Sequence, residues 1–139
     1  MSPLVCLVAF ALWALLLVGA LGLVRGGLVL VGRRRPTDFP GGVQHGGDAY
    51  WRLNRAHLNT VENLPIFGAI VLSGVVLHVA TPMFLLLPKV IVCARVVQSL
   101  AHLSSGRSLA INARFTAFIV QVASMVALAI EVLRRATGS

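Results

Sequence analysis

The sequence has little charge of either sign, and acidic residues are the scarcest: Asp and Glu together number 4 in 139 residues. Charged residues make up 12% of the chain, whereas hydrophobic residues make up 58%. A soluble domain of this length has too few polar side chains to cover so much apolar surface. The composition therefore excludes an ordinary soluble domain and predicts an integral membrane protein.

Cysteines and aromatic residues are scarce as well. The 2 cysteines, Cys6 and Cys93, fall inside apolar segments without metal-ligand spacing, so we predict buried small side chains, no disulfide and no metal site. The net charge of +8 could indicate a nucleic-acid partner, but no basic groove with stacking aromatics accompanies it. Cationic loops at lipid headgroups explain the arginines better, so the predicted partner is the lipid bilayer and not nucleic acid.

Four long hydrophobic segments predict the fold. The first, Leu4 to Val24, has 21 residues without a charge, enough to span about 30 Å of hydrocarbon. A cleaved signal peptide would need a basic start and a shorter apolar core. The predicted helices cover approximately residues 4–24, 48–80, 83–103 and 111–133. Short turns and the absence of a repeat predict an all-α, up-and-down bundle of four transmembrane helices, which forms one membrane domain over residues 1–139.

The arginines are unevenly divided between the two ends of this predicted bundle. Eight lie in or beside the first and third loops, whereas Lys89, Arg134 and Arg135 lie toward the other end. The positive-inside rule then predicts loops one and three in the cytoplasm and both termini outside.

The stretch "RAHLNTVENLPIF" at 55–67 carries unusual polarity into the second hydrophobic segment. At about 100° per residue, Arg55, Asn59 and Glu62 share one stripe of a helix, whereas His57 points away from it. Further polar faces occur on the third and fourth helices, formed by Arg95, Gln98, Ser99 and His102 and by Arg114 and Gln121.

Charged groups at membrane depth cost roughly 2.5–3.5 kcal/mol each to insert, so we expect them to face inward and to be paired or used. One interpretation is structural, with Glu62 neutralising Arg95 and the amides joining the helices. It leaves several arginines without acidic partners. A bound anion with several carboxylates would complete such a site, with the ligand's ammonium group at Glu62.

The same stretch resembles the second-helix signature of the MAPEG family, membrane-associated proteins in eicosanoid and glutathione metabolism. That signature reads approximately R-x-H/Q-x-N-x-x-E-x-x-P-x-F, and it is filled here by Arg55, His57, Asn59, Glu62, Pro65 and Phe67. Four spans, a basic first loop and "AR" at 94–95 extend the resemblance over the whole chain. Short loops and an Ala-, Val- and Arg-rich composition resemble a bacterial member similar to microsomal glutathione transferases, and they predict a multi-pass protein of a bacterial inner membrane.

The resemblance implies a homotrimer, with glutathione as co-substrate bound between neighbouring subunits near the cytoplasmic face. Arg55 would hold a glutathione carboxylate, Asn59 would hydrogen-bond the tripeptide, and Glu62 would meet its α-ammonium group. The further residues that it assigns to the glutathione site are His57, Arg95, His102 and Arg25. His57 points away from the stripe of Arg55, and this direction is compatible with two positions. The side chain could enter a site shared with a neighbouring subunit, or it could face the lipid headgroups.

The resemblance also implies a catalytic role for Arg107, which stands where family enzymes place an arginine that acts on the thiol. A guanidinium group beside the sulfur favours the thiolate, which is the nucleophile. Glutathione could then attack a lipophilic small molecule dissolved in the bilayer. The predicted function is a glutathione-dependent membrane transferase or peroxidase.

Two observations keep alternatives open. Family enzymes commonly carry tyrosines at the positions of Gln98 and His102, and the single tyrosine here is Tyr50. This departure is compatible with a non-catalytic lipid- or ligand-binding scaffold of the same family. A small multidrug transporter also has four short helices, but it would need a membrane-embedded acid in the first helix, and Leu4–Val24 contains none.

Overall fold

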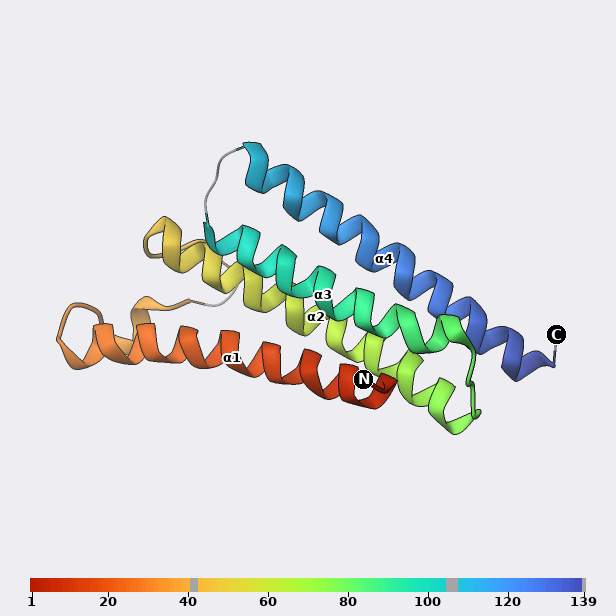
Figure 1. Ribbon diagram of the computed structural model, residues 1–139. Helices are drawn as coiled ribbons and strands as arrows, with labels where there is room; N and C mark the ends of the chain where they lie inside the picture. The colour runs from red at the N-terminus through yellow and green to blue at the C-terminus, as the bar shows by residue number, and fades with distance from the viewer. Residues whose placement is uncertain (41–42, 105–107, 139) are drawn as a thin grey trace.

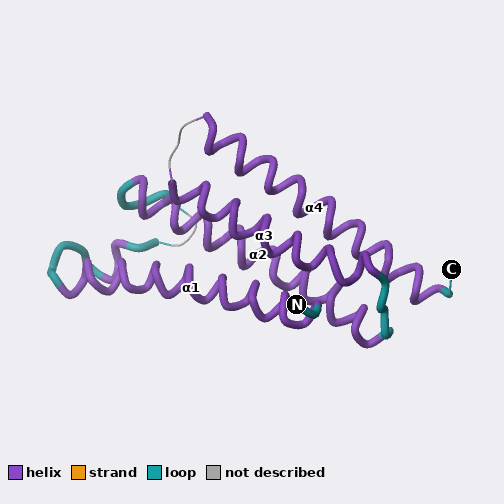
Figure 2. The backbone as a smooth tube through the Cα atoms, in the orientation of Figure 1, coloured by secondary structure: helices purple, strands orange, loops and turns teal. Residues whose placement is uncertain are grey.

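Four long α-helices form the protein. The computed structural model describes residues 1–40, 43–104 and 108–138. The helices are α1 (Pro3–Leu30), α2 (Asp48–Val76), α3 (Pro82–Ser104) and α4 (Ser108–Thr137), and a short 3₁₀ helix, η1, covers Pro36–Asp38 (Figures 1 and 2). Each long helix contains an apolar stretch sufficient to cross a membrane. The prediction of an all-helical bundle with four spans is confirmed, and the chain is a multi-pass membrane protein.

Local sequence explains where α1 and α3 begin. Ser2 precedes Pro3, and its Oγ accepts a hydrogen bond from the backbone N–H of Val5 at 3.3 Å. Thr81 precedes Pro82, and its Oγ1 accepts from the N–H of Phe84 at 3.1 Å. A hydroxyl cap followed by proline suits a helix start, because proline has no N–H to leave unsatisfied there.

The end of α2 differs from the sequence prediction, which extended this helix to about residue 80. The backbone N–H of Val79 donates to the carbonyl of Gly74 at 2.9 Å, and that of His78 donates to Val75 at 3.1 Å. This pair of bonds is a Schellman motif, which requires a left-handed residue after the helix. His78 supplies it with a φ of 54°, so the helix stops at Val76 although the sequence stays apolar beyond it.

The helices pack around one core. α1 lies against α2 and α3 on one side, and α4 lies against α3 and α2 on the other (Figure 1). The core takes its largest side chains from all four helices: Phe10, Phe67, Phe84, Ile91 and Leu128. The rings of Phe10 and Phe67 lie 5.3 Å apart between centroids, which ties α1 to α2.

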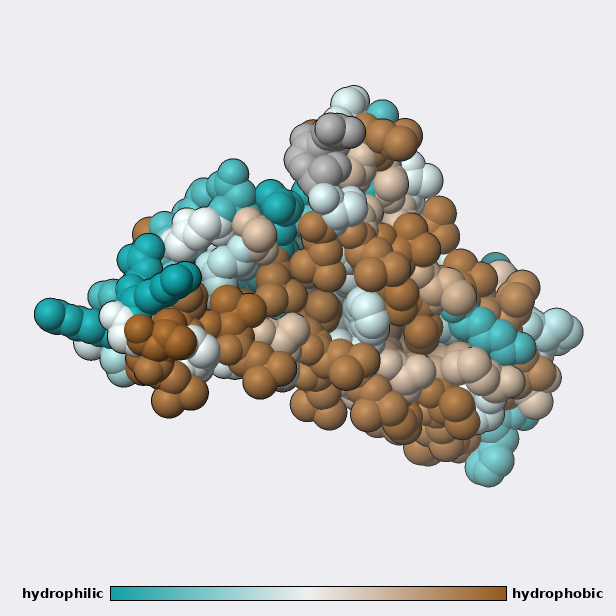
Figure 3. All heavy atoms as spheres, turned by 60° about the vertical axis from the view of Figure 1, so that its left-hand side comes forward, coloured by the Kyte–Doolittle hydropathy of each residue, from teal (hydrophilic) through white to brown (hydrophobic). Residues whose placement is uncertain are grey.

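Polarity is concentrated at the ends of the bundle. Loop one, the end of α3 and the start of α4 lie at one end, called here the loop-one end, and loop two lies with both termini at the other, called the loop-two end (Figure 1). Hydrophobic side chains cover the middle of the molecule, and hydrophilic ones gather at the loop-one end (Figure 3). Apolar side chains exposed along the helices, such as Leu16 and Phe115, are what a lipid-facing or subunit-facing surface requires.

Gly74 provides a test of the contact between the loop-two ends of α2, α3 and α4. A Cβ atom at this position would overlap the ring of Phe84 and approach Val132 to 3.1 Å. We expect Gly74→Ala to destabilise the protein by about 1–3 kcal/mol through overpacking. Thermal unfolding of the detergent-solubilised protein measures this loss. The control is Gly68→Ala on the same helix, where the new methyl group would meet Leu7 at an ordinary 3.7 Å. Equal unfolding temperatures for the two variants would contradict the proposed contact.

Candidate ligand-binding site at the loop-one end

α2 carries the signature residues on two different faces near the loop-one end. Arg55 and Glu62 are exposed, and Asn59 is half-buried on the side that meets α3. His57 is half-buried on the side that meets α1, where it lines a pocket with Arg25. The predicted divergence of His57 from the Arg55 stripe is therefore present in the structure.

On the α3 side, three side chains from three helices form a chain of contacts. The side-chain amide of Asn59 in α2 lies 3.3 Å from Nε2 of His102 in α3. Nη1 of Arg114 in α4 lies 3.2 Å from Nδ1 of the same imidazole. The amide of Asn63 also donates to the carbonyl of Asn59 at 2.7 Å, which holds this turn of α2 in place.

The chemistry of these groups determines who donates to whom. A guanidinium nitrogen only donates, so Nδ1 of His102 must accept from Arg114. Nε2 of a neutral imidazole then carries the hydrogen and must donate. The oxygen and nitrogen of an amide are interchangeable by a half-turn, so we assign the Asn59 oxygen to the position facing His102. This assignment turns the Asn59 NH₂ group, with its two donors, away from His102.

On the α1 side, a pocket of about 250 Å³ opens between α1, loop one and α2. Its polar lining consists of Arg25, His45, Asn54 and His57. Nδ1 of His57 is buried and has no hydrogen-bond partner among the described residues. A pocket with one guanidinium group, two imidazoles and an amide can hold a carboxylate or another small anion.

Tyr50 and His45 hold Arg25 in position. Nε of Arg25 donates to the hydroxyl of Tyr50 at 2.6 Å. Nδ1 of His45 lies 2.7 Å from the carbonyl of Val43, so it must donate there, and Nε2 is free to accept from Tyr50 at 3.1 Å. The guanidinium group also lies 5.6 Å from the centre of the Phe39 ring. Hydrogen bonds and cation–π contacts together restrict Arg25 to one orientation.

Arg95 occupies a different environment from the other candidate residues. It is 1% exposed, and its guanidinium carbon lies 5.7 Å from the centre of the Phe10 ring. Nε and Nη2 have no hydrogen-bond partner, and within the described residues no ion pair joins Arg95 to Glu62. The geometry does not contain the Glu62–Arg95 pair of the structural interpretation.

Two buried amides accompany Arg95. Gln98 is 5% exposed with an unpartnered Oε1, and Gln121 is fully buried with both amide atoms unpartnered. α3 and α4 are antiparallel, and His102 of α3 contacts Arg114 of α4. Seven residues from this contact toward the loop-two end, Arg95 of α3 lies level with Gln121 of α4. These residues form a polar layer inside the bundle, separate from the exposed side chains Arg55 and Glu62.

The cysteines fit their prediction only in part, because Cys6 is buried but Cys93 is exposed on α3. Arg107, the predicted catalytic residue, lies outside the described residues. Among the residues that are described, no group of three or more His, Cys, Asp or Glu side chains could hold a metal ion.

Sequence analysis missed the Tyr50–His45–Arg25 network. The sequence analysis assigns Tyr50 no role, because it does not lie on the third helix where family enzymes carry tyrosines. His45 lies in a Gly- and Pro-rich loop whose path no periodicity predicts. The available signal was the spacing of five residues between two hydrogen-bonding aromatic side chains at the start of a helix. This signal is weak without knowledge that α1 ends beside it.

The four apolar helices of the described residues define a polytopic helical membrane protein. The model of the MAPEG family matches residues 3–134, and the chain belongs to this family. That family includes glutathione-dependent transferases and peroxidases. A search of the curated proteins and a search of the solved structures found no match.

The Tyr50 hydroxyl can be tested separately from its ring. Tyr50→Phe removes the acceptor of Arg25 and the donor to His45, each bond worth about 0.5–1.5 kcal/mol and more where a charge is involved. We expect loop one to open more often, so that trypsin cleaves after Arg33 and Arg34 several-fold faster. Ser104→Ala removes another hydroxyl with a local hydrogen bond and serves as the control. Unchanged cleavage of the Tyr50→Phe protein would contradict the positioning role of the hydroxyl.

Proposed function

We propose that this chain is a glutathione-dependent membrane transferase or peroxidase, active as a homotrimer with glutathione bound between neighbouring subunits. The observation that carries the proposal is the division of the family signature between two faces of α2. Arg55, Asn59 and Glu62 belong to one face, and His57 belongs to the other with Arg25. One bound tripeptide touches both sets only if they come from different subunits, because α2 itself separates them within one subunit.

The first face has the groups that a tripeptide with two carboxylates and one ammonium requires. Arg55 is exposed and offers a planar fork to a carboxylate, and exposed Glu62 suits the α-ammonium group. The NH₂ group of Asn59, turned away from His102, suits a carboxylate or peptide carbonyl of the same ligand. His102 and Arg114 then act by holding Asn59 in place.

The second face supplies further cationic and polar groups from a neighbour. The pocket that contains Arg25 and His57 is about 250 Å³, which is enough for one end of a tripeptide and not for the whole. Arg25 is oriented by Tyr50 before any ligand arrives, so little side-chain entropy is lost on binding. This preorganisation supports a binding role for Arg25.

The reaction requires a cation close to the thiol. Arg107, between α3 and α4 in the sequence, is the proposed group, because it would stabilise the thiolate that attacks the electrophile. Arg114 is the nearest rival, but one of its nitrogens already donates to His102. Arg95 is buried and lies away from the exposed face, so we propose that it acts on the site from within the bundle.

The membrane position fits the two substrates. A lipophilic electrophile would arrive through the bilayer, and glutathione from the cytoplasm, where the positive-inside rule places the arginine-rich loop-one end. We propose that the protein lies in a bacterial inner membrane with loops one and three on the cytoplasmic side.

A scaffold function is the second candidate, and Gln98 favours it. This residue stands where family enzymes carry a tyrosine, and it is 5% exposed inside the bundle. His102, at the other such position, is engaged with Asn59 and Arg114. Gln98 is enclosed in the bundle and both ring nitrogens of His102 are engaged, so binding without turnover is the outcome if Arg107 does not stabilise the thiolate.

Mixed trimers test whether the site lies between subunits. We expect Glu62→Gln and Arg25→Gln each to lower the affinity for glutathione, because each removes one charged partner. When the two variants are co-expressed in equal amounts, about one quarter of the interfaces should combine two intact halves, as a cyclic assembly requires. Calorimetry on the purified mixture should therefore recover high-affinity sites, and native mass spectrometry should find three subunits.

The control mixes Glu62→Gln with Arg55→Gln, two variants of the same face. No interface in that mixture has two intact halves, so high-affinity binding should stay absent. If the whole site lay within one subunit, the first mixture would also stay silent. That result, or a strictly monomeric particle in mild detergent, would reject the shared site.

Ionisation of the thiol separates an enzyme from a scaffold. A cation within about 4–6 Å of the sulfur lowers the thiol pKa by one unit or more. Glutathione added at neutral pH should therefore produce thiolate absorbance in the ultraviolet with the wild-type protein. Arg107→Ala should abolish both this signal and conjugation of a generic aryl halide, while Arg55 and Glu62 still hold the tripeptide. Arg34→Ala, an exposed arginine of loop one, is the matched control. Glutathione that binds without ionising would favour the scaffold.

A further inference from the structure

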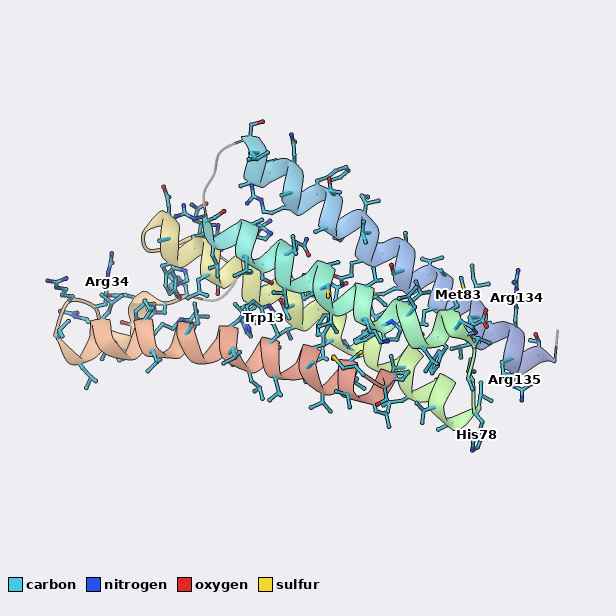
Figure 4. The ribbon with its side chains drawn as sticks, in the orientation of Figure 1. Trp13, Arg34, His78, Met83, Arg134 and Arg135 are labelled. Carbon is cyan, nitrogen blue, oxygen red and sulfur yellow. The ribbon has the colours of Figure 1, made fainter. Side chains whose placement is uncertain are left out.

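A second charged pocket lies at the loop-two end, opposite the glutathione site. Its volume is about 390 Å³, and loop two and the last turns of α4 form it. The polar side chains that line it are His78, Thr81, Glu131, Arg134 and Arg135. Figure 4 shows His78, Arg134 and Arg135 at the end of the bundle remote from Arg34. Nothing in the proposed glutathione chemistry uses these residues.

The charges of this pocket are available to a ligand. Glu131 and both arginines lie within two turns of one helix, yet across the described residues no ion pair joins them. The hydroxyl oxygen of Thr81 accepts from the N–H of Phe84, which leaves its hydrogen free to donate. The pocket therefore presents two guanidinium groups and a hydroxyl donor to an anion, with one carboxylate beside them for a cation.

An apolar groove follows on the same side of α4. It lies between α3 and α4, has a volume of about 630 Å³, and includes Lys89, Cys93, Ala113 and Thr116 in its lining. Ala113 and Thr116 of the groove precede Glu131 and Arg134 of the charged pocket by eighteen residues each. Eighteen residues are five full helical turns, so the members of each pair point in the same direction from α4. The charged pocket and the groove thus open on one face of α4.

The register of α3 and α4 gives the depth of the groove. Extended from the His102–Arg114 contact, it places Lys89 and Cys93 level with Ala127 and Ala123 of α4. These levels lie about 10 and 16 Å below Arg134 at 1.5 Å per residue. The α4 lining of the groove ends at Val120, about 21 Å below Arg134. One leaflet is about half of the 30 Å hydrocarbon thickness, so an acyl chain that starts beside Arg134 reaches only the end of the groove at Lys89 and Cys93.

We propose that this face binds a phospholipid with an ethanolamine headgroup, in the leaflet at the loop-two end. Arg134 and Arg135 hold the phosphodiester, Glu131 pairs with the primary ammonium, and an acyl chain lies in the groove beside Cys93. The carboxylate decides the headgroup, because a primary ammonium can donate hydrogen bonds to it. A quaternary ammonium has no N–H to donate and cannot approach the carboxylate as closely, and a headgroup without an ammonium offers it no cation. The stem of Lys89 can carry its ammonium toward the same interface.

Lipid binding to the purified, detergent-solubilised protein tests this proposal. Native mass spectrometry and thermal unfolding would be measured with dipalmitoyl phosphatidylethanolamine, with the matching phosphatidylcholine, and with phosphatidylglycerol. We expect the ethanolamine lipid to bind most tightly. The double variant Arg134→Gln/Arg135→Gln should lose about tenfold or more in affinity for it, since each charged hydrogen bond contributes that much. Glu131→Gln should remove the preference over phosphatidylcholine.

Matched controls separate this site from general effects of charge and surface. Arg33→Gln/Arg34→Gln removes two adjacent exposed arginines at the other end and should leave lipid affinity unchanged. Cys93→Phe fills the groove and should weaken the lipid, whereas Leu86→Phe, at another exposed position of α3, should not.

Three results would overturn the proposal. The first is wild-type lipid affinity in the Arg134→Gln/Arg135→Gln variant. The second is effective competition by free phosphoethanolamine at the lipid's own concentration, which would indicate a soluble phosphate ligand. The third is tighter binding of phosphatidylglycerol than of the ethanolamine lipid, which would contradict the role of Glu131.

Discussion

A bilayer offers no water to a polar side chain, and the arrangement of α2 depends on this constraint. The helix carries polar residues on opposite faces at nearly the same depth, so one neighbouring helix cannot satisfy them all. Asn59 meets His102 of α3, and His57 faces the pocket beside Arg25 of α1. Arg55 and Glu62 stay exposed, with no ion pair in the described part of the chain. Exposed charges near membrane depth call for a partner from outside the subunit, either a ligand or another copy.

The sequence predicted most of the fold and the directions of the site residues. Long apolar segments identified the four spans, and the angle between Asn59 and His57 followed from helical periodicity. The contacts between helices did not follow, because periodicity within one helix says nothing about how far it is shifted along its neighbour. The His102–Arg114 contact depends on that shift, and the Tyr50–His45 contact depends on the path of loop one. The end of α2 at Val76 was missed because His78 adopts a left-handed conformation that glycine usually supplies.

The polar layer inside the bundle has a different physical role from the exposed face. Arg95 and Gln121 lie at one level and are almost completely buried with unpartnered atoms. Buried polar groups without partners are costly in an apolar interior. Few alternative packings of the helices can therefore accommodate them. Ser99 adds a direct tie, since Trp13 of α1 donates to its hydroxyl at 3.1 Å (Figure 4). A shift of α3 by one turn would break this bond and the contact of Arg95 with the Phe10 ring. The layer therefore favours one register of α1, α3 and α4, which in turn places His102 beside Asn59.

The histidine at position 102 changes what the third helix can contribute to chemistry. A tyrosine would present one hydroxyl that is free to turn toward a thiol, whereas both nitrogens of His102 are already in use. The imidazole joins α2 to α4 through its contacts with Asn59 and Arg114, so under the proposed function it would act on a ligand through Asn59. A thiol bound there would have to be stabilised by a guanidinium group rather than by a hydroxyl on α3. The contacts of His102 are therefore compatible with the proposal that a cation such as Arg107 acts on the thiol.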